Sequence, residues 1–297
     1  MNRRNFTKIS LAGALAIPAR MASAADAEAP YKSLFAPHPR MLPTAPKDYM
    51  DQMQFAYDHG FRAWEDNRLS RQDRKIWDKV GEFCKDKKFT MGVSIITDGR
   101  GLDFSNPSKE EMAQIEADMK LGIELSKATG QIHMTYVPGG RNEMPRNEQI
   151  VRAADTVKRC CDLVEEHGII FCQEPISHPM SNKDPLIKTF ADGHLLCKTV
   201  NRKSCKLLAD FFHEGELGYG DKLIENAEKV WDQVAYVQYG DSPGRKEPGT
   251  GKLDYTAVTK WLRKKGYQGV IGMEHKASGK GKEGLDALLA SYRAIDA

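Results

Sequence analysis

The chain has 297 residues, of which 40% are hydrophobic and 29% charged, and its formal net charge is +3. This composition is typical of a globular protein and excludes a disordered chain, and beyond the N-terminus no apolar run is long enough to span a bilayer. The nearly neutral charge gives no electrostatic argument for binding to nucleic acid.

The N-terminus has the features of an export signal. Arg3 and Arg4 precede a short apolar run of small residues, and Ala22-Ser23-Ala24 is a small-residue cleavage site. The paired arginines and the residues after them resemble the twin-arginine signal, which a receptor reads and which is not an anchor. We therefore expect residues 1–24 to be a signal peptide and the mature chain to be exported to the periplasm, without a membrane anchor. The alternatives are an ordinary secretory signal and an amphipathic N-terminal helix.

Predicted strands and helices alternate along the rest of the chain. Ser108 and Glu111 form a capping box, and apolar residues then recur at helical spacing up to Gly130. Strands are predicted at 31–38, 61–67, 90–99, 131–140, 168–175 and 205–212. Two further strands are predicted to end at Gln238 and at Glu274. Helices are predicted at 46–60, before 87, and at 108–130, 147–168, 188–203, 221–234, 254–265 and 284–295.

About eight strand and helix repeats with short connections indicate a parallel sheet covered by helices. Eight repeats favour closure into a (β/α)8 barrel over an open doubly wound sheet, and the glycine fingerprint of an open sheet is missing after Phe35. We expect residues 31–297 to form this α/β barrel as a single domain.

Polar side chains follow four predicted strands at the point where each strand ends: Glu174, Asp210, Gln238 and Glu274. In a barrel these ends meet at one mouth. Three carboxylates close together repel each other unless a cation or protons neutralise them. A set of carboxylate and amide oxygens suits Mg²⁺ or Mn²⁺, whereas a zinc site would contain more histidine or cysteine. The six cysteines show no CxxC spacing and are expected to be structural and mostly reduced.

Two glutamates on opposite sides of such a metal suit proton transfer. A metal bound to a carbonyl and its neighbouring hydroxyl acidifies the C–H between them, so that one carboxylate can remove the proton and the other can return it at the adjacent carbon. This chemistry is aldose–ketose isomerisation, or epimerisation, through an enediolate.

The run from Tyr236 to His275, YVQYGDSPGRKEPGTGKLDY followed by GYQGVIGMEH, resembles the C-terminal signature of the hydroxypyruvate isomerase-like branch of the xylose-isomerase-like TIM barrels. Weaker similarity extends through GFRAWEDN, IHMTYVPGG and CQEPIS. The resemblance implies that Glu174 and Glu274 are the acid and base and also metal ligands. It further implies that Asp210 and Gln238 complete the metal site, and that His213 and Arg245 contact substrate oxygens.

Two segments depart from the family pattern. SHPMSNKDPLIK replaces the loop that usually follows the first catalytic glutamate, and HEGELGYGDK after Asp210-Phe-Phe-His213 is shorter and lacks an expected Gln. These segments line the substrate pocket in the family, so the substrate stays open between hydroxypyruvate or tartronate semialdehyde and a ketose. The expected partner is such a small molecule, and self-association into a homo-oligomer stays open.

Several other polar residues have simpler interpretations. Asp241 and Glu247 are interpreted as shaping a loop, and Glu65 as a structural partner that could also assist substrate binding. No role is assigned to the histidines near strand ends, which are His38, His133, His178 and His275.

Three functions compete at this point. The leading one is an exported metal-dependent isomerase or epimerase. The others are a metal-dependent lyase or dehydratase on a related barrel, which would change the mass of its substrate, and an exported barrel that binds carbohydrate without catalysis. The related endonucleases carry a histidine-rich site for several zinc ions, which this sequence does not show.

Overall fold

A computed structural model describes residues 28–97, 102–139, 143–179 and 184–297, so the predicted signal peptide lies outside the described residues. The strands are β1 (Leu34–Ala36), β2 (Ala63–Trp64), β3 (Thr90–Met91), β4 (Ser94–Thr97), β5 (His133–Tyr136), β6 (Ile170–Gln173), β7 (Cys205–Asp210), β8 (Val234–Tyr239) and β9 (Val270–Met273).

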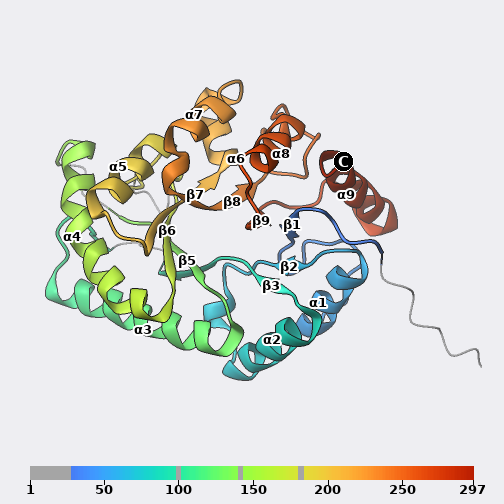
Figure 1. The fold of residues 1–297 in the computed structure, drawn as a ribbon, viewed down its shortest axis with the longest axis horizontal. Helices are drawn as coiled ribbons and strands as arrows, with labels where there is room; N and C mark the ends of the chain where they lie inside the picture. The colour runs from blue at the N-terminus through green and yellow to red at the C-terminus, as the bar shows by residue number, and fades with distance from the viewer. Residues whose placement is uncertain (1–27, 98–101, 140–142, 180–183) are drawn as a thin grey trace, which may run out of the picture.

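All paired strands run parallel. One sheet has the order β1-β9-β8-β7-β6-β5-β4, and β2 pairs with β3. β3 and β4 are two parts of one barrel strand, interrupted at Gly92 and Val93. Glu65 donates its backbone N–H to the carbonyl of Pro37 at 3.1 Å and so joins the segments that follow β1 and β2. Figure 1 shows the strands as a central ring with the helices outside, which is the predicted (β/α)8 barrel.

The helices follow the predicted pattern of caps. Ser108 and Glu111 form the predicted capping box, and the helix after them ends where Gly130 takes a φ of 75°. The α-helices are α1 (Tyr49–Asp58), α2 (Arg74–Lys87), α3 (Lys109–Thr129), α4 (Arg146–Val164), α5 (Phe190–Val200), α6 (Phe211–Glu214), α7 (Leu223–Val230), α8 (Tyr255–Lys264) and α9 (Gly281–Ile295). Within the described residues, no helix is long and apolar enough to cross a membrane.

The apolar core has two parts. The larger part lies between the ring of strands and the helices. The smaller part fills the inside of the barrel with residues from strands all around the ring, namely Ala36, Ala63, Val93, Cys172, Leu208, Tyr236 and Val270. This cluster contains both Ala36 of β1 and Val93, which directly precedes β4. Since β1 and β4 are the two ends of the strand order, the sheet is closed. All six cysteines are unpaired, and all except Cys84 are buried.

The strand predicted at 205–212 is wrong in its last two residues. β7 ends at Asp210, whose Oδ1 accepts a hydrogen bond from the backbone N–H of Phe212 at 2.9 Å, and the short helix α6 begins at Phe211. The two phenylalanines have the apolar character of a strand, but the aspartate before them caps a helix.

Candidate active site

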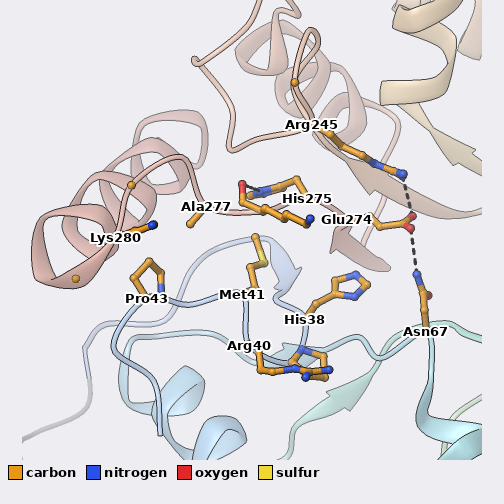
Figure 2. A pocket seen from close by; sticks show the side chains of 15 residues that line it. His38, Arg40, Met41, Pro43, Asn67, Arg245, Glu274, His275, Ala277 and Lys280 are labelled. Carbon is orange, nitrogen blue, oxygen red and sulfur yellow. Dashed lines mark hydrogen bonds and ion pairs between the residues drawn. The ribbon is translucent and has the colours of Figure 1, made fainter. Parts of the chain in front are cut away.

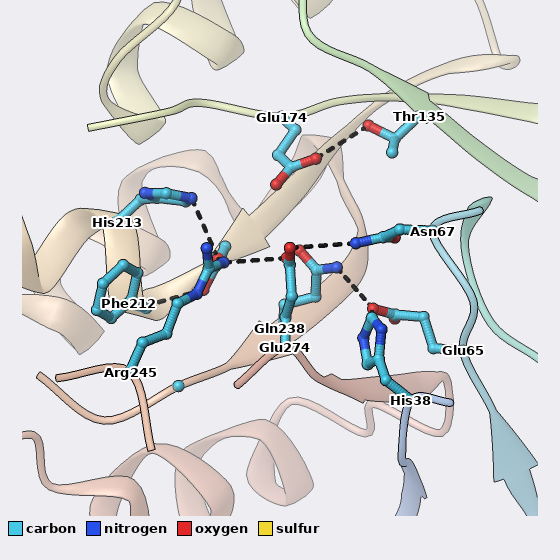
Figure 3. A network of polar contacts seen from close by, with 12 residues as sticks. His38, Glu65, Asn67, Thr135, Glu174, Phe212, His213, Gln238, Arg245 and Glu274 are labelled. Carbon is cyan, nitrogen blue, oxygen red and sulfur yellow. Dashed lines mark hydrogen bonds and ion pairs between the residues drawn. The ribbon is translucent and has the colours of Figure 1, made fainter. Parts of the chain in front are cut away.

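Alternation along the strands places the predicted residues inside the barrel. The barrel interior contains Cys172, Leu208 and Tyr236. Two residues after each of them come Glu174, Asp210 and Gln238, which therefore share that face. Asp210 and Gln238 are also direct partners in the pairing of β7 with β8, and Glu274 follows Gly272 of β9 on the same face. All four side chains thus lie at the carboxyl end of the barrel, where Figure 3 shows Glu174, Gln238 and Glu274.

Glu174, Asp210 and His213 form a buried group in which one ligand atom of each lies within 4.8 Å of the other two. It is the one group of three or more acidic, histidine or cysteine side chains in the described part of the chain that is spaced to hold a metal ion. Asp210 is fully buried and Glu174 is 4% exposed.

Arg245 joins the other predicted glutamate to this group. Its Nη2 donates a hydrogen bond to Asp210 Oδ2 at 2.7 Å and lies 3.1 Å from Glu274 Oε2. The guanidinium also packs over the ring of Phe212, 4.5 Å from its centroid. Arg245 reaches this position from the loop after β8, where its own φ is 50°. Glu274 accepts a further hydrogen bond from Asn67 Nδ2 at 3.1 Å.

The carboxylates carry more negative charge than Arg245 neutralises. Burial, and then the charges of Glu274 and Asp210, raise the pKa of Glu174 well above its usual value. Burial raises the pKa of Asp210 to about 7, although the nearby Arg245 opposes this shift. In the absence of a further cation, the protein would therefore hold protons at this site near neutral pH.

Gln238 is oriented by a second buried carboxylate. Its Nε2 donates to Glu65 Oε1 at 2.8 Å, and the hydroxyl of Tyr236 donates to the other oxygen of Glu65. His38 Nε2 lies 2.6 Å from Glu65 Oε1. Because the amide nitrogen of Gln238 is engaged, its Oε1 is turned away from Glu65, is buried, and has no hydrogen-bond partner among the described residues.

Two glycines make room for this arrangement. A Cβ atom on Gly272 would overlap the carboxylate of Glu65, and one on Gly92 would overlap the hydroxyl of Tyr236. The space beside Glu65 thus depends on glycine in β9 and at the break between β3 and β4.

The tautomer of His213 follows from its neighbours. The backbone N–H of Ser177 can only donate, and it lies 3.3 Å from Nδ1, which must therefore be the acceptor. Ser177 Oγ lies 2.9 Å from the same nitrogen. Burial and then Arg245 hold the pKa of His213 well below its usual value, so the ring is neutral with its proton on Nε2. Nε2 faces Asp210 Oδ2 at 3.5 Å. This tautomer suits a hydrogen-bond donor to a substrate oxygen better than a metal ligand.

The site fits a divalent cation held by oxygen atoms. Gln238 Oε1 and Glu274 Oε2 are buried and accept no hydrogen bond from the described residues. Among the described residues, the one hydrogen bond to the carboxylate of Glu174 is a long one from Thr135 Oγ1, at 3.5 Å. Oxygens from three carboxylates and an amide are the donors that hard cations prefer, although both oxygens of Asp210 already accept hydrogen bonds.

The structure therefore brings together all six predicted site residues. His38 and Asn67, which received no role from the sequence, also belong to the site, and Glu65 lies at the centre of its hydrogen bonds (Figure 3). The signal that could have found these residues is alternation, because His38 comes two residues after the interior residue Ala36, and Glu65 and Asn67 follow the interior residue Ala63 at steps of two.

Asp241 and Glu247 shape the Arg245 loop, as predicted. Asp241 accepts hydrogen bonds from the backbone N–H groups of Gly249, Gly251 and Leu253. Glu247 accepts them from the backbone and the hydroxyl of Ser278.

Comparison with known proteins supports this description. The family model described as xylose isomerase-like TIM barrel matches residues 53–295. The chain is 24% identical over 244 residues to a 2-oxo-tetronate isomerase of Haemophilus influenzae, covering 80% of this chain and 92% of that protein. It is 25% identical over 185 residues to the hydroxypyruvate isomerase of Escherichia coli, covering 60% of this chain and 68% of that protein.

Solved structures show the same fold at low identity. A protein described as AP endonuclease, family 2, from Brucella melitensis has a TM-score of 0.73 and 19% identity, over 88% of this chain and 98% of that one. An L-ribulose 3-epimerase has a TM-score of 0.67 and 18% identity, over 89% of this chain and 90% of that one.

Proposed function

Because the chain belongs to the xylose isomerase-like TIM barrel family, we propose that it is a divalent-metal-dependent isomerase or epimerase of a small hydroxy-carbonyl compound. The substrate class is hydroxypyruvate and tartronate semialdehyde, or a ketose. The observation that carries this proposal is that Glu174, Asp210, Gln238 and Glu274 lie at one end of the barrel, where Gln238 Oε1 and Glu274 Oε2 are buried and accept no hydrogen bond from the described residues. The similarity to proteins named hydroxypyruvate isomerase and 2-oxo-tetronate isomerase supports the same reaction type.

Glu174, Asp210, Gln238 and Glu274 would hold the cation, Mg²⁺ or Mn²⁺. When bound, the cation supplies a positive charge that polarises a carbonyl and acidifies the C–H beside it. Asp210 is held in place by the backbone N–H of Phe212, and Gln238 by Glu65, so both side chains are set before any substrate binds.

The two glutamates move the proton. Glu174 extends from β6 and Glu274 from β9, and they approach the centre of the site from different sides (Figure 3). One removes a proton from the hydroxyl-bearing carbon beside the carbonyl. The other then delivers a proton either to the former carbonyl carbon, while the hydroxyl proton moves to the former carbonyl oxygen, or to the opposite face of the same carbon. The first outcome is isomerisation and the second is epimerisation.

Two further residues bind the oxygens that become charged. His213 presents its Nε2–H to the site, and Arg245 presents a guanidinium that already contacts Asp210 and Glu274. Donors fixed toward an oxygen that gains negative charge stabilise the enediolate more than the substrate.

The test is turnover of hydroxypyruvate and a panel of ketoses in deuterated water by the Mn²⁺-loaded protein. The expected result is an isomer or epimer that differs in mass only by deuterium bound to carbon. A product of different elemental composition would replace the isomerase by the lyase or dehydratase. Absence of turnover throughout the panel, with metal bound, would support the non-catalytic carbohydrate-binding barrel.

Variants of the two glutamates make the test specific. Glu174→Gln and Glu274→Gln keep the side-chain shape but cannot carry the proton, so each should lower kcat by at least ~100-fold. Glu214→Gln is the matched control, because that buried carboxylate contacts the backbone of Phe190 and the side chain of Asn226 instead. Full activity in either test variant would remove that glutamate from the mechanism.

Export to the periplasm is a separate part of the proposal and rests only on Arg3, Arg4 and the small-residue sequence that follows. Cell fractionation of the full chain and of an Arg3→Lys/Arg4→Lys variant tests it. The full chain should be found in the periplasm and the variant in the cytoplasm.

A further inference from the structure

A pocket of about 900 Å³ opens directly beside the proposed active site. Asn67, Arg245 and Glu274 form part of its lining, so it is continuous with the groups assigned to catalysis. This volume lies near the upper end of the range for pockets that hold drug-sized ligands. A three-carbon molecule bound at the carboxylates would leave much of the pocket empty.

The lining contains three basic residues in addition to Arg245. Arg40, Lys276 and Lys280 all line the pocket, and Glu274 is its one acidic lining residue. Within the part of the chain that the structure describes, none of these three basic side chains forms an ion pair with a carboxylate, although burial raises the pKa of Asp66 and the charge of Arg40 opposes that rise. Positive charges gathered in a concave site raise the local concentration of anions.

The backbone fixes the position of Arg40 and adds positive charge near Lys280. Arg40 has a φ of 63°, which is unfavourable for a residue with a side chain, and its N–H is held by the buried Gln52 Oε1 at 2.6 Å. Lys280 is the N-cap residue of α9, and no side chain among the described residues caps that helix. The first N–H groups of α9 therefore add partial positive charge beside Lys280 and Gly281, which both line the pocket.

Figure 2 shows the pocket between the proposed catalytic residues and Lys280. Arg245, Glu274 and Asn67 lie at one side of the view and Lys280 at the other, with the apolar side chain of Met41 between them. The arrangement matches a molecule with a reactive hydroxy-carbonyl at one end, a carbon chain in the middle, and a negative group at the other end.

We propose that the pocket binds a carboxylate or phosphate group at the end of the substrate remote from the reacting carbons. This inference rests on the proposed function, because that function defines which end of the substrate reacts. It narrows the substrate to a hydroxy-carbonyl compound of four or more carbons that carries a terminal anion. A neutral ketose would leave Arg40, Lys276 and Lys280 without a partner.

The test compares three probes of the same four-carbon skeleton by calorimetry on the Mn²⁺-loaded full chain. Erythritol is neutral, erythronate has a carboxylate, and erythritol 4-phosphate has a phosphate. At least one of the two anions should bind at least ~10-fold more tightly than erythritol, and the stronger of the two identifies the anion. Equal affinity for all three probes would overturn the inference.

Variants distinguish anion binding by the basic residues of the pocket from anion binding directly to the metal. Arg40→Gln/Lys280→Gln should remove the preference for the anion and leave the affinity for erythritol unchanged. Lys79→Gln/Lys260→Gln is the matched control, because it removes the same charge from exposed positions outside the pocket and should retain the preference. A preference that survives in Arg40→Gln/Lys280→Gln would assign the anion to the metal and overturn the inference. The turnover experiment in deuterated water is independent, so a neutral substrate could still be isomerised if the binding test fails.

Discussion

The side-chain amide of Gln238 donates to Glu65 Oε1 at 2.8 Å, and this single hydrogen bond determines which atom of Gln238 faces the carboxylates. An amide has a donor end and an acceptor end, and only the oxygen can bind a cation. Glu65 therefore acts on the proposed metal site through Gln238 without reaching the site itself.

We expect Glu65→Gln to weaken the binding of Mn²⁺ by about 10- to 100-fold, the usual effect of altering a group that orients a metal ligand. The new amide presents its own N–H groups to its partners, so Gln238 can turn its nitrogen toward the carboxylates. The measurement is the rise in melting temperature over a Mn²⁺ titration. In Glu214→Gln, a buried change outside these contacts, that rise should equal the one in the unaltered protein. An unchanged titration in Glu65→Gln would mean that Gln238 does not depend on Glu65.

Gly272→Ala should lower the free energy of unfolding by about 1–3 kcal/mol, because the added methyl group would overlap the buried carboxylate of Glu65. Gly220→Ala is the comparison, since its nearest neighbour outside the adjoining residues is the flexible end of Leu253 at 3.1 Å. Urea denaturation of both variants measures the difference. Equal stability would show that Glu65 can move without cost.

Arg245→Gln should make the stability of the protein depend more strongly on bound metal. The guanidinium contacts both Asp210 and Glu274, so its loss leaves their negative charges less compensated. We expect the metal-free variant to lose about 1–3 kcal/mol of stability, less than for a fully buried pair because the Arg245 side chain is 26% exposed. Added Mn²⁺ should then raise its melting temperature by more than it raises that of the unaltered protein.

Arg202→Gln is the control for this prediction. Arg202 forms surface ion pairs with Asp162 and Glu165, and such pairs contribute little to stability. Its response to Mn²⁺ should not change. An equal response in the two variants would separate Arg245 from the metal site.

His133 should make the protein less stable in mild acid. Burial lowers the pKa of His133 to about 4, from 6.5 in the unfolded chain, so between these values only the unfolded chain binds the proton. Stability therefore falls as the pH drops through this window, by at most about 1.4 kcal/mol per pH unit from this residue. His133→Asn should show a shallower loss in denaturation experiments between pH 7 and 4.5. Identical slopes would exclude His133 as a cause.

Much of the fold and the site could be predicted because the information is local. The alternation of strands and helices, the capping box at Ser108, and polar residues directly after strands can all be recognised in short windows of sequence. The closed barrel then follows from the number of repeats, and the meeting of Glu174, Asp210, Gln238 and Glu274 follows from closure.

The features of the site that could not be predicted depend on contacts between residues far apart in the sequence. Glu65 meets Tyr236 and Gln238, which are 171 and 173 positions away, and the space for it depends on Gly92 and Gly272. Arg245 lies in a loop, and its direction depends on a positive φ that no short pattern indicates. Its contact with both Asp210 and Glu274 was therefore not predictable, although its place in the site was.

The buried side chains that fill the barrel below the site have a consequence for the hydrogen atom that the proposed reaction moves. They leave Glu174, which is 4% exposed, without a route to bulk water through the floor, so any exchange must occur through the mouth, where substrate would block it. The hydrogen that one glutamate removes should then stay on that glutamate until the product leaves, while the product receives the hydrogen held by the other glutamate.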